Sequence, residues 1–280
     1  MDYLNWEQMS LNSNPKIIKL LCEKHPDKIN WEYLCLNTHL NLSIIKENLD
    51  KIKWSYLCSN PNPEVISILK ENPNKINWYY LSSNPGALTL IKENLDKINW
   101  GCLSSNTNPE ILPLLEGNPA DIYWYYISSN PIAIPLIKKN LNKINWWSLC
   151  RNPNPEVISI LKKNPNKINW FYLSLHPHIS SNMINNNKHN LNWFCLSSNP
   201  NPDVITLIKE NLDKIYWDQL CLNTNKEALE LLKENPDKIN WNNLCRNPSP
   251  DIIPILKENP TKINWYNLSS NPNVIYMIDK

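Results

Sequence analysis

Short apolar runs separated by asparagine and proline recur along the whole chain. Within each run the apolar residues are spaced three and four apart, which is the period of an amphipathic helix and not of a strand. The stretch 60–78, with the sequence NPNPEVISILKENPNKINW, returns at 152–170 with a single change, from Glu71 to Lys163. Related copies fill nearly all of the remaining sequence, so we expect a tandem array in which each copy packs on its neighbours.

A tryptophan in each copy sets the register, and successive tryptophans are 22 to 25 residues apart. Longer copies carry proline five residues before the tryptophan and shorter copies carry leucine there, so the module through the middle of the chain is a pair of about 46 residues. The repeat tryptophans are Trp6, Trp31, Trp54, Trp78, Trp100, Trp124, Trp146, Trp170, Trp193, Trp217, Trp241 and Trp265.

Each repeat contains signals for two short helices. In the first, Asn62 suits the N-cap and Pro63 the first helical position, while the Asn-Pro pair at 72–73 stops the helix. In the second, Asn77 is the expected N-cap and Trp78 the first helical residue. Helices this short are marginal alone and need stacking against neighbours. The sequence therefore predicts an all-α fold, an α-solenoid of about twelve two-helix repeats that forms one domain over residues 1–280.

One weak repeat, over residues 174–192, departs from the pattern. His176 replaces the asparagine that stands six residues after every other repeat tryptophan, and His178 and His189 follow it. A metal site is one interpretation, since histidine is the commonest metal ligand. We favour the other, a drifted repeat, because no carboxylate or cysteine lies at ligand spacing. The prediction is no metal and no cofactor.

The position four residues after the repeat tryptophan holds only serine or cysteine. We interpret this as selection for a small side chain, because a free cysteine packs as a small hydrophobe. No Cys-x-x-Cys pair occurs, so we expect neither zinc nor a disulfide framework, and reduced thiols suit an intracellular protein. The cysteines at this position are Cys35, Cys58, Cys150, Cys221 and Cys245.

Charge and composition exclude several classes of function. The net charge is only +2, with lysine and glutamate interleaved, which gives no strong attraction to nucleic acid or to an anionic membrane. Neither a long apolar run nor a secretory leader is present, so we expect a soluble, non-secreted chain without a membrane segment. No phosphate-binding loop and no nucleophile–base arrangement stands out, and we predict that the protein is not an enzyme.

The two ends of the array are each half a repeat. The chain begins with the second helix of a repeat and ends with a first helix, over 273–280. The apolar side chains of that last helix have no following repeat to cover them, so we expect an exposed patch that could support a homo-oligomer. These side chains are Val274, Ile275, Met277 and Ile278.

Aromatic residues occupy two roles in the second helices. The repeat tryptophans share a face with the leucine or isoleucine three residues later, so we predict that they are the structural core and not a stacking ladder for nucleic acid. The position two residues after the tryptophan is expected to point most nearly outward, with the position after the tryptophan beside it. We predict that rings at these two positions form a partner-binding strip, although packing on the neighbouring repeat is an open alternative. The candidates are Tyr33, Tyr56, Tyr79, Tyr80, Tyr125, Tyr126, Trp147, Phe171, Tyr172 and Phe194.

The repeat pattern NPxxIxxLKENPDKINWxxLSxNP, best matched at 60–84, 152–176 and 235–247, resembles repeat proteins encoded by giant DNA viruses of the mimivirus-like kind. The resemblance covers essentially the whole chain and departs at residues 176–188. It implies a tandem-repeat protein found in the host cytoplasm or in the virion, and it implies no catalytic residues.

Three functions remain open from the sequence. The first is a non-catalytic scaffold that binds an unknown protein partner along the aromatic strip. The second is a structural virion component that assembles through the last helix. The third, which the balanced charge disfavours, is single-stranded nucleic-acid binding, with the rings stacking on bases and the repeated lysines on phosphates. These lysines are Lys51, Lys75, Lys97, Lys143 and Lys167.

Overall fold

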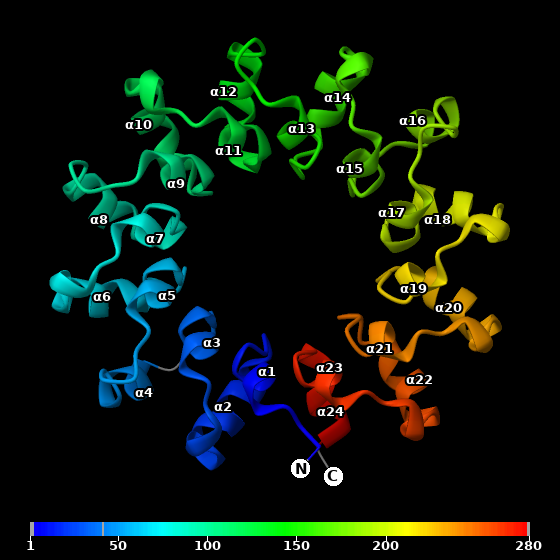
Figure 1. Cartoon of the computed structure of the whole chain (residues 1–280), viewed down its shortest axis with the longest axis horizontal. Coiled ribbons are helices and arrows are strands. Elements are labelled where there is room, and N and C mark those ends of the chain that lie inside the picture. Colours follow the sequence, from blue (N-terminus) through cyan, green and yellow to red (C-terminus); the bar gives the residue numbers. More distant parts are fainter. Residues whose placement is uncertain (1–2, 41, 279–280) are drawn as a thin grey trace. The chain divides into compact units, whose positions relative to one another are not determined.

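A computed structural model describes residues 3–40 and 42–278 of the chain (Figure 1). The described residues form α-helices and short 3-10 helices and contain no strand, which confirms the predicted all-α repeat solenoid. Every odd-numbered helix begins at a repeat tryptophan. We call the odd-numbered helices the tryptophan helices and the even-numbered ones the companion helices.

The tryptophan helices are four to six residues long. They are α1 (Trp6–Ser10), α3 (Trp31–Leu36), α5 (Trp54–Ser59), α7 (Trp78–Ser82), α9 (Trp100–Ser105), α11 (Trp124–Ser129), α13 (Trp146–Leu149), α15 (Trp170–Ser174), α17 (Trp193–Ser198), α19 (Trp217–Leu220), α21 (Trp241–Leu244) and α23 (Trp265–Ser269).

The companion helices are four to ten residues long, and a single turn of 3-10 helix precedes several of them. They are α2 (Pro15–Lys24), α4 (Leu42–Glu47), α6 (Pro63–Glu71), α8 (Leu88–Glu93), α10 (Leu112–Gly117), α12 (Ile134–Lys139), α14 (Glu156–Lys162), α16 (Ser181–Asn186), α18 (Pro202–Lys209), α20 (Lys226–Glu234), α22 (Ile252–Glu258) and α24 (Ile275–Ile278).

Contacts between residues divide the described chain into two compact parts. The middle part comprises residues 15–157, and the end part comprises residues 3–14 together with 158–278. In the middle part, the tryptophan helices α3, α5, α7, α9, α11 and α13 contact one another in that order, and α4 packs on α6. In the end part, α15, α17 and α19 form the same kind of row, with α16 on α18 and α22 on α24. Within each part, Figure 1 shows one row of tryptophan helices beside one row of companion helices.

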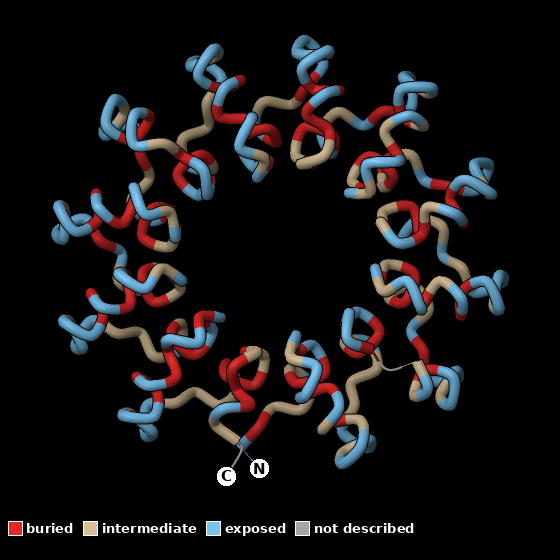
Figure 2. Tube along the Cα trace, turned by 180° about the vertical axis from the view of Figure 1, so that it is seen from behind, coloured by how far each residue is buried: buried red, intermediate tan, exposed pale blue. Residues whose placement is uncertain are grey.

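The core lies where the two rows of a part meet, and Figure 2 shows the buried stretches there. Leu81 and Leu103, each three residues after a repeat tryptophan, are fully buried, as are Leu69 and Ile91 from the companion helices. Removing such side chains from water contributes about 1.5–3 kcal/mol each, which explains how helices of one or two turns are held in place.

Helix starts follow the predicted caps. The side chain of Asn77 accepts hydrogen bonds from the backbone N–H groups of Tyr79 and Tyr80, and Asn62 accepts one from Glu64 N–H at 3.0 Å. Both contacts satisfy donors that the first turn of a helix leaves without intrahelical partners. Three tryptophan helices lack this cap, because Lys53, Tyr123 or Tyr216 stands where the other repeats carry asparagine.

A buried asparagine six residues after the tryptophan joins each repeat to the one before it. In Asn106 the side-chain amide donates to the carbonyl oxygens of Ser82 and Asn84, both at 3.0 Å, while its Oδ1 accepts from the N–H of Asn108. The same pair of donations is made by Asn60, Asn84, Asn130, Asn152, Asn199, Asn223, Asn247, Asn271 and Asn12. These bonds fix the spacing between repeats and satisfy buried carbonyls.

The serine or cysteine position is small, as predicted, but it also carries hydrogen bonds. Ser128 Oγ donates to the carbonyl of Trp124 and accepts from the backbone N–H of Asn145 in the next repeat at 2.9 Å. Cys58 accepts from Asn77 N–H through its sulfur at 3.3 Å, in the same register. Serine and cysteine are both small and can both accept a hydrogen bond. Alanine is also small but cannot accept one, which explains why it does not occur at this position.

The weak repeat, residues 174–192, keeps the fold. His176 is buried, its Nδ1 accepts from the backbone N–H of His178 at 3.1 Å, and its carbonyl accepts from Asn199. The imidazole thus takes over the acceptor role of the asparagine that it replaces. Among the described residues, no three His, Cys, Asp or Glu side chains gather in a group that could hold a metal ion.

The expectation of an uncovered last helix is wrong. Val274 is fully buried and Ile275 nearly so, while Met277 and Ile278 are half-buried. Helix α24 packs on α22, and the N-terminal residues 3–14 lie against α23 and the segment after it. The two half-repeats at the ends of the chain complete each other, which the sequence analysis did not consider.

Candidate binding surface

The ten predicted ring positions divide into two groups by exposure. Tyr79, Tyr80, Tyr125, Tyr126, Trp147, Phe171 and Phe194 are exposed, whereas Tyr33, Tyr56 and Tyr172 are half-buried. The expectation that the second position after the tryptophan points most outward is wrong. Tyr79, at the first position, is 55% exposed and Tyr80, at the second, is 38% exposed. In a helix of five residues, the segments before and after the helix also cover its side chains. The angle of a residue around the helix axis therefore does not by itself set its exposure.

In the middle part, exposed rings lie on α7, α11 and α13, which are three of four consecutive tryptophan helices. The Tyr79 and Tyr80 rings meet edge to face with centroids 5.3 Å apart, and those of Tyr125 and Tyr126 do so at 5.4 Å. Tyr125 then stacks on Trp147 of α13, with ring centroids 6.0 Å apart and planes tilted by 24°. Such geometries are favoured between aromatic side chains.

Helix α9 carries small residues at the ring positions and continues the surface by other means. A hydrogen bond between Tyr79 and the Cys102 thiol raises the pKa of Tyr79, and the nearby Tyr126 contributes in the same direction. Gly101 lies under the Tyr123 ring, because a Cβ atom placed there would meet that ring at 3.5 Å. Larger side chains at positions 101 and 102 of α9 would occupy the space over which the Tyr79 and Tyr123 rings lie.

One cation ends this surface. The guanidinium carbon of Arg151 lies 5.2 Å from the centre of the Trp147 ring, within the range of a cation–π interaction. We define the aromatic strip as Tyr79, Tyr80, Tyr123, Tyr125, Tyr126 and Trp147, together with Arg151. The strip is therefore both packed within itself and open to solvent, so the two interpretations of the sequence are combined in one structure.

Three exposed tyrosines that adjoin a repeat tryptophan were missed by the sequence analysis. Tyr123 and Tyr216 stand directly before a repeat tryptophan, and Tyr266 directly after one. The Tyr216 ring meets Phe194 edge to face at 5.5 Å in the end part. The signal was available, since a tyrosine in a position that otherwise holds a capping asparagine breaks a local rule without a packing gain in the core.

The repeat tryptophans are not in the buried core, which corrects the prediction. Each is half-buried, while the neighbouring Leu or Ile and Ser or Cys positions are fully buried. The tryptophan is the first residue of its helix, so its ring lies at the edge of the repeat, where the next repeat covers only one face. A lysine of that next repeat lies over the ring, as Lys97 does over Trp78 with Nζ 5.4 Å from the ring centre. Corresponding pairs are Lys51 with Trp31, Lys143 with Trp124 and Lys214 with Trp193.

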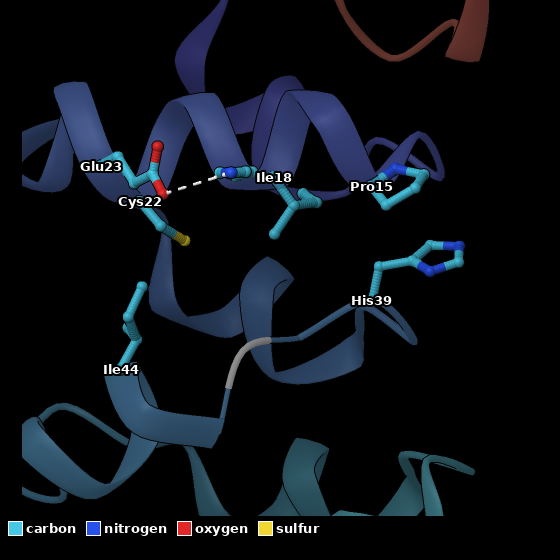
Figure 3. A pocket seen from close by; sticks show the side chains of 7 residues that line it. Pro15, Ile18, Cys22, Glu23, His39 and Ile44 are labelled. Carbon is cyan, nitrogen blue, oxygen red and sulfur yellow. Dashed lines mark ion pairs between the residues drawn. The ribbon is translucent and has the colours of Figure 1, made fainter.

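A pocket of about 390 Å³ lies on the companion row of the middle part (Figure 3). Figure 3 shows Ile18 and Cys22 pointing from α2 toward Ile44 of α4, and the Lys19–Glu23 ion pair at 3.8 Å borders the opening. Burial raises the pKa of the Cys22 thiol, with Glu23 adding to the effect. A thiol that remains protonated at neutral pH is a poor nucleophile, so this pocket offers an apolar surface and not a reactive group.

All eight cysteines lie in the described residues as free thiols. Exposed ion pairs such as Lys92–Glu110, at 3.0 Å, join successive companion helices. None of the described helices combines the length and the apolar content that crossing a bilayer requires.

Comparison with protein-family models, curated proteins and solved structures finds no match to this chain.

Proposed function

We propose that the chain is a non-catalytic scaffold that binds a protein partner along the aromatic strip. The observation that carries this proposal is two groups of exposed rings in mutual contact, Tyr79 with Tyr80 on α7, and Tyr126, Tyr125 and Trp147 on α11 and α13. Every one of these rings is more than a third exposed. Water-exposed aromatic side chains held in place by their neighbours lose little conformational entropy on binding, and Tyr, Trp and Arg are the residues enriched at binding hot spots.

The strip favours a polypeptide ligand. Its tyrosines place hydroxyl groups beside apolar ring faces, so they can satisfy backbone groups of a partner while burying its apolar side chains. Arg151 supplies one fixed positive charge at the α13 end, which suits a carboxylate or a further aromatic ring. Repeat arrays present such extended surfaces because each repeat adds one row of side chains.

The test is a comparison of two double variants of the full chain as bait in lysate of the source cells. Tyr80→Ala/Tyr126→Ala removes two rings of the strip, and Tyr266→Ala/Tyr276→Ala removes two more exposed tyrosines outside it. We expect proteins retained by the wild type and by the control to be lost with the first variant. The melting temperature should change little in either case, because exposed substitutions cost about 0.5 kcal/mol or less.

Two results would contradict the proposal. Equal retention by both variants would mean that the strip is not the binding surface. A large fall in melting temperature for Tyr80→Ala/Tyr126→Ala alone would mean that these rings serve folding. A single-stranded oligonucleotide column at low salt tests the competing ligand class, because nucleic-acid binding weakens steeply as salt rises. The resemblance to giant-virus repeat proteins predicts that the partner is found in the host cytoplasm or in the virion.

A further inference from the structure

The N-terminal residues 3–14 form the missing second half of the last repeat. Asn5 N–H donates to Ser269 Oγ at 2.9 Å, and the Asn12 side-chain amide donates to the carbonyl oxygens of Ser269 and Asn271, both at 2.9 Å. Asn14 donates to the carbonyl of Pro272 at 2.8 Å. Helix α1 packs on α23, so the two ends of the chain are joined inside the end part.

Every one of these bonds has a counterpart at an interior junction. Between α7 and α9, Asn99 N–H donates to Ser82 Oγ at 2.8 Å, Asn106 donates to two carbonyls, and Asn108 donates to the Pro85 carbonyl at 2.9 Å. The joint between the ends is therefore built like any other joint between repeats, with one difference: the chain does not run through it.

The residue over the tryptophan ring is also specific to this joint. Four interior repeats place a lysine there, three residues before the next tryptophan, as Lys97 does over Trp78. The corresponding residue before Trp6 is Tyr3, whose ring centre lies 4.4 Å from that of Trp265. Leu4 takes the place of the usual isoleucine and is buried. An apolar ring contact replaces the cation, which strengthens the one joint that has no covalent support.

We propose that the surface formed by Trp265, Ser269 and the 271–272 carbonyls also receives residues 3–14 of a second copy of the chain, so that two copies exchange their ends. The contacts are the same whether the segment comes from the same copy or another, so the choice depends on concentration. A tethered segment has an effective concentration on the order of millimolar, and a second copy competes when closure is opened or when copies are concentrated together.

This inference replaces the patch proposed from sequence. Val274 and Ile275 are buried, so they cannot bind a second copy while the fold is intact. What a second copy can use is the site that the N-terminal half-repeat already occupies. Reciprocal exchange would close a dimer, and one-way exchange would continue into a longer chain of copies.

The first measurement locates the site with a fluorescent peptide of residues 3–14 as the probe. Its anisotropy is followed with the full-length wild type and with full-length Tyr3→Ala/Asn12→Ala, in which the chain's own segment holds the site less well. We expect the peptide to bind the variant at least about tenfold more tightly than the wild type, because the competing segment is weakened. A matched peptide with the Asn12→Ala change should not bind. Equal binding to both chains, or no binding to either at about 1 mM peptide, would overturn the proposal.

The second measurement detects the exchange itself. The full chain is refolded at increasing concentration and its mass is followed by light scattering after dilution. The dimer fraction of the wild type should rise with refolding concentration. After dilution, dimers of Tyr3→Ala/Asn12→Ala should return to monomers several-fold faster than dimers of the wild type, because a weaker joint opens more often. The milder Asn14→Ala, which loses the hydrogen bond to the Pro272 carbonyl, should lie between them, and it serves if the double variant does not fold as judged by circular dichroism. A monomer at every concentration would exclude the exchange.

Discussion

At the scale of single residues, the serine or cysteine after each tryptophan shows how one small side chain serves two repeats. Ser104 Oγ donates to the Trp100 carbonyl within its own helix and accepts the N–H of Tyr123 from the next repeat. Cys221 accepts the Asn240 N–H through sulfur at 3.3 Å in the same way. A buried N–H without such an acceptor costs about 1–3 kcal/mol, which is why the array tolerates the exchange of oxygen for sulfur.

The buried cysteines predict a loss of stability at alkaline pH. Burial raises the pKa of Cys221 from 9.0 to about 11, against a smaller lowering by the Asn240 N–H. Since the unfolded chain releases this proton first, the contribution of Cys221 is fully present below pH 9 and is lost as the pH rises toward 11. We expect Cys221→Ser to reduce the fall in unfolding free energy between pH 7 and pH 10 by about 1 kcal/mol, measured by urea unfolding.

Serine is the appropriate replacement because it occupies this position in Ser82, Ser104 and Ser128. All other titratable side chains are the same in both proteins, so the comparison isolates the Cys221 thiol. Identical pH dependence in the variant and the wild type would show that this thiol does not contribute.

At the scale of elements, the N-caps reveal where the chain gives up helix stability. Most tryptophan helices have an asparagine at the N-cap, and its side chain accepts a hydrogen bond from the first turn. In α11 and α19 the N-cap residues are Tyr123 and Tyr216, which make no such bond. Both tyrosines are more than half exposed. A tyrosine at the N-cap loses the capping hydrogen bond and places an exposed ring next to other rings. We interpret this loss of helix stability as a sign that the ring is needed at the surface.

The replacement of Tyr123 by asparagine should therefore stabilise the protein. Tyr123→Asn restores the cap of α11, and we expect the free energy of unfolding to rise by about 0.5–1 kcal/mol in urea titrations. The same variant should retain less partner, since it removes a ring of the aromatic strip. Tyr266→Asn, at a similarly exposed position inside α23, restores no cap and should leave stability unchanged. Destabilisation by Tyr123→Asn would mean that packing of the ring over Gly101 outweighs the cap.

At the scale of the whole molecule, the two half-repeats contact each other within the end part. The N-terminal half-repeat docks on α23, and α24 is buried against α22. Solenoid proteins usually protect their ends with polar capping repeats. Here each half-repeat is protected by the other, so the stability of the last repeat depends on residues at the opposite end of the sequence.

Because the last helix is partly buried, a charge introduced on its buried side should lower the free energy of unfolding. Val274 is fully buried, so Val274→Asp places an uncompensated carboxylate in the core and should lower the free energy of unfolding by about 3 kcal/mol or more. Tyr276→Asp, two residues later at a position 58% exposed, should change it by about 0.5 kcal/mol or less. Urea unfolding of the two variants measures the difference. If both variants unfold like the wild type, the last helix is not covered.

The candidate surface was predictable in part. The exposed rings of Tyr79, Tyr80, Tyr125, Tyr126 and Trp147 follow from the register of the repeats. The half-burial of Tyr33 and Tyr56 does not, because it depends on which side chains the adjoining helices place beside them. Tyr123 joins the strip through a contact with Gly101 of the preceding repeat, which no local pattern encodes. Arg151 reaches the Trp147 ring from four residues away in the same repeat.

The sequence by itself determined the helices: their number, their order, their caps and their stops. These features depend on residues within one turn of each other, and the same local pattern recurs in the twelve copies. Only the tertiary structure decided that the tryptophans stay at the edge of each repeat, that the serine position is an acceptor, and that the two half-repeats meet. Those outcomes depend on contacts between residues of different repeats, so the pattern within a single copy does not reveal them.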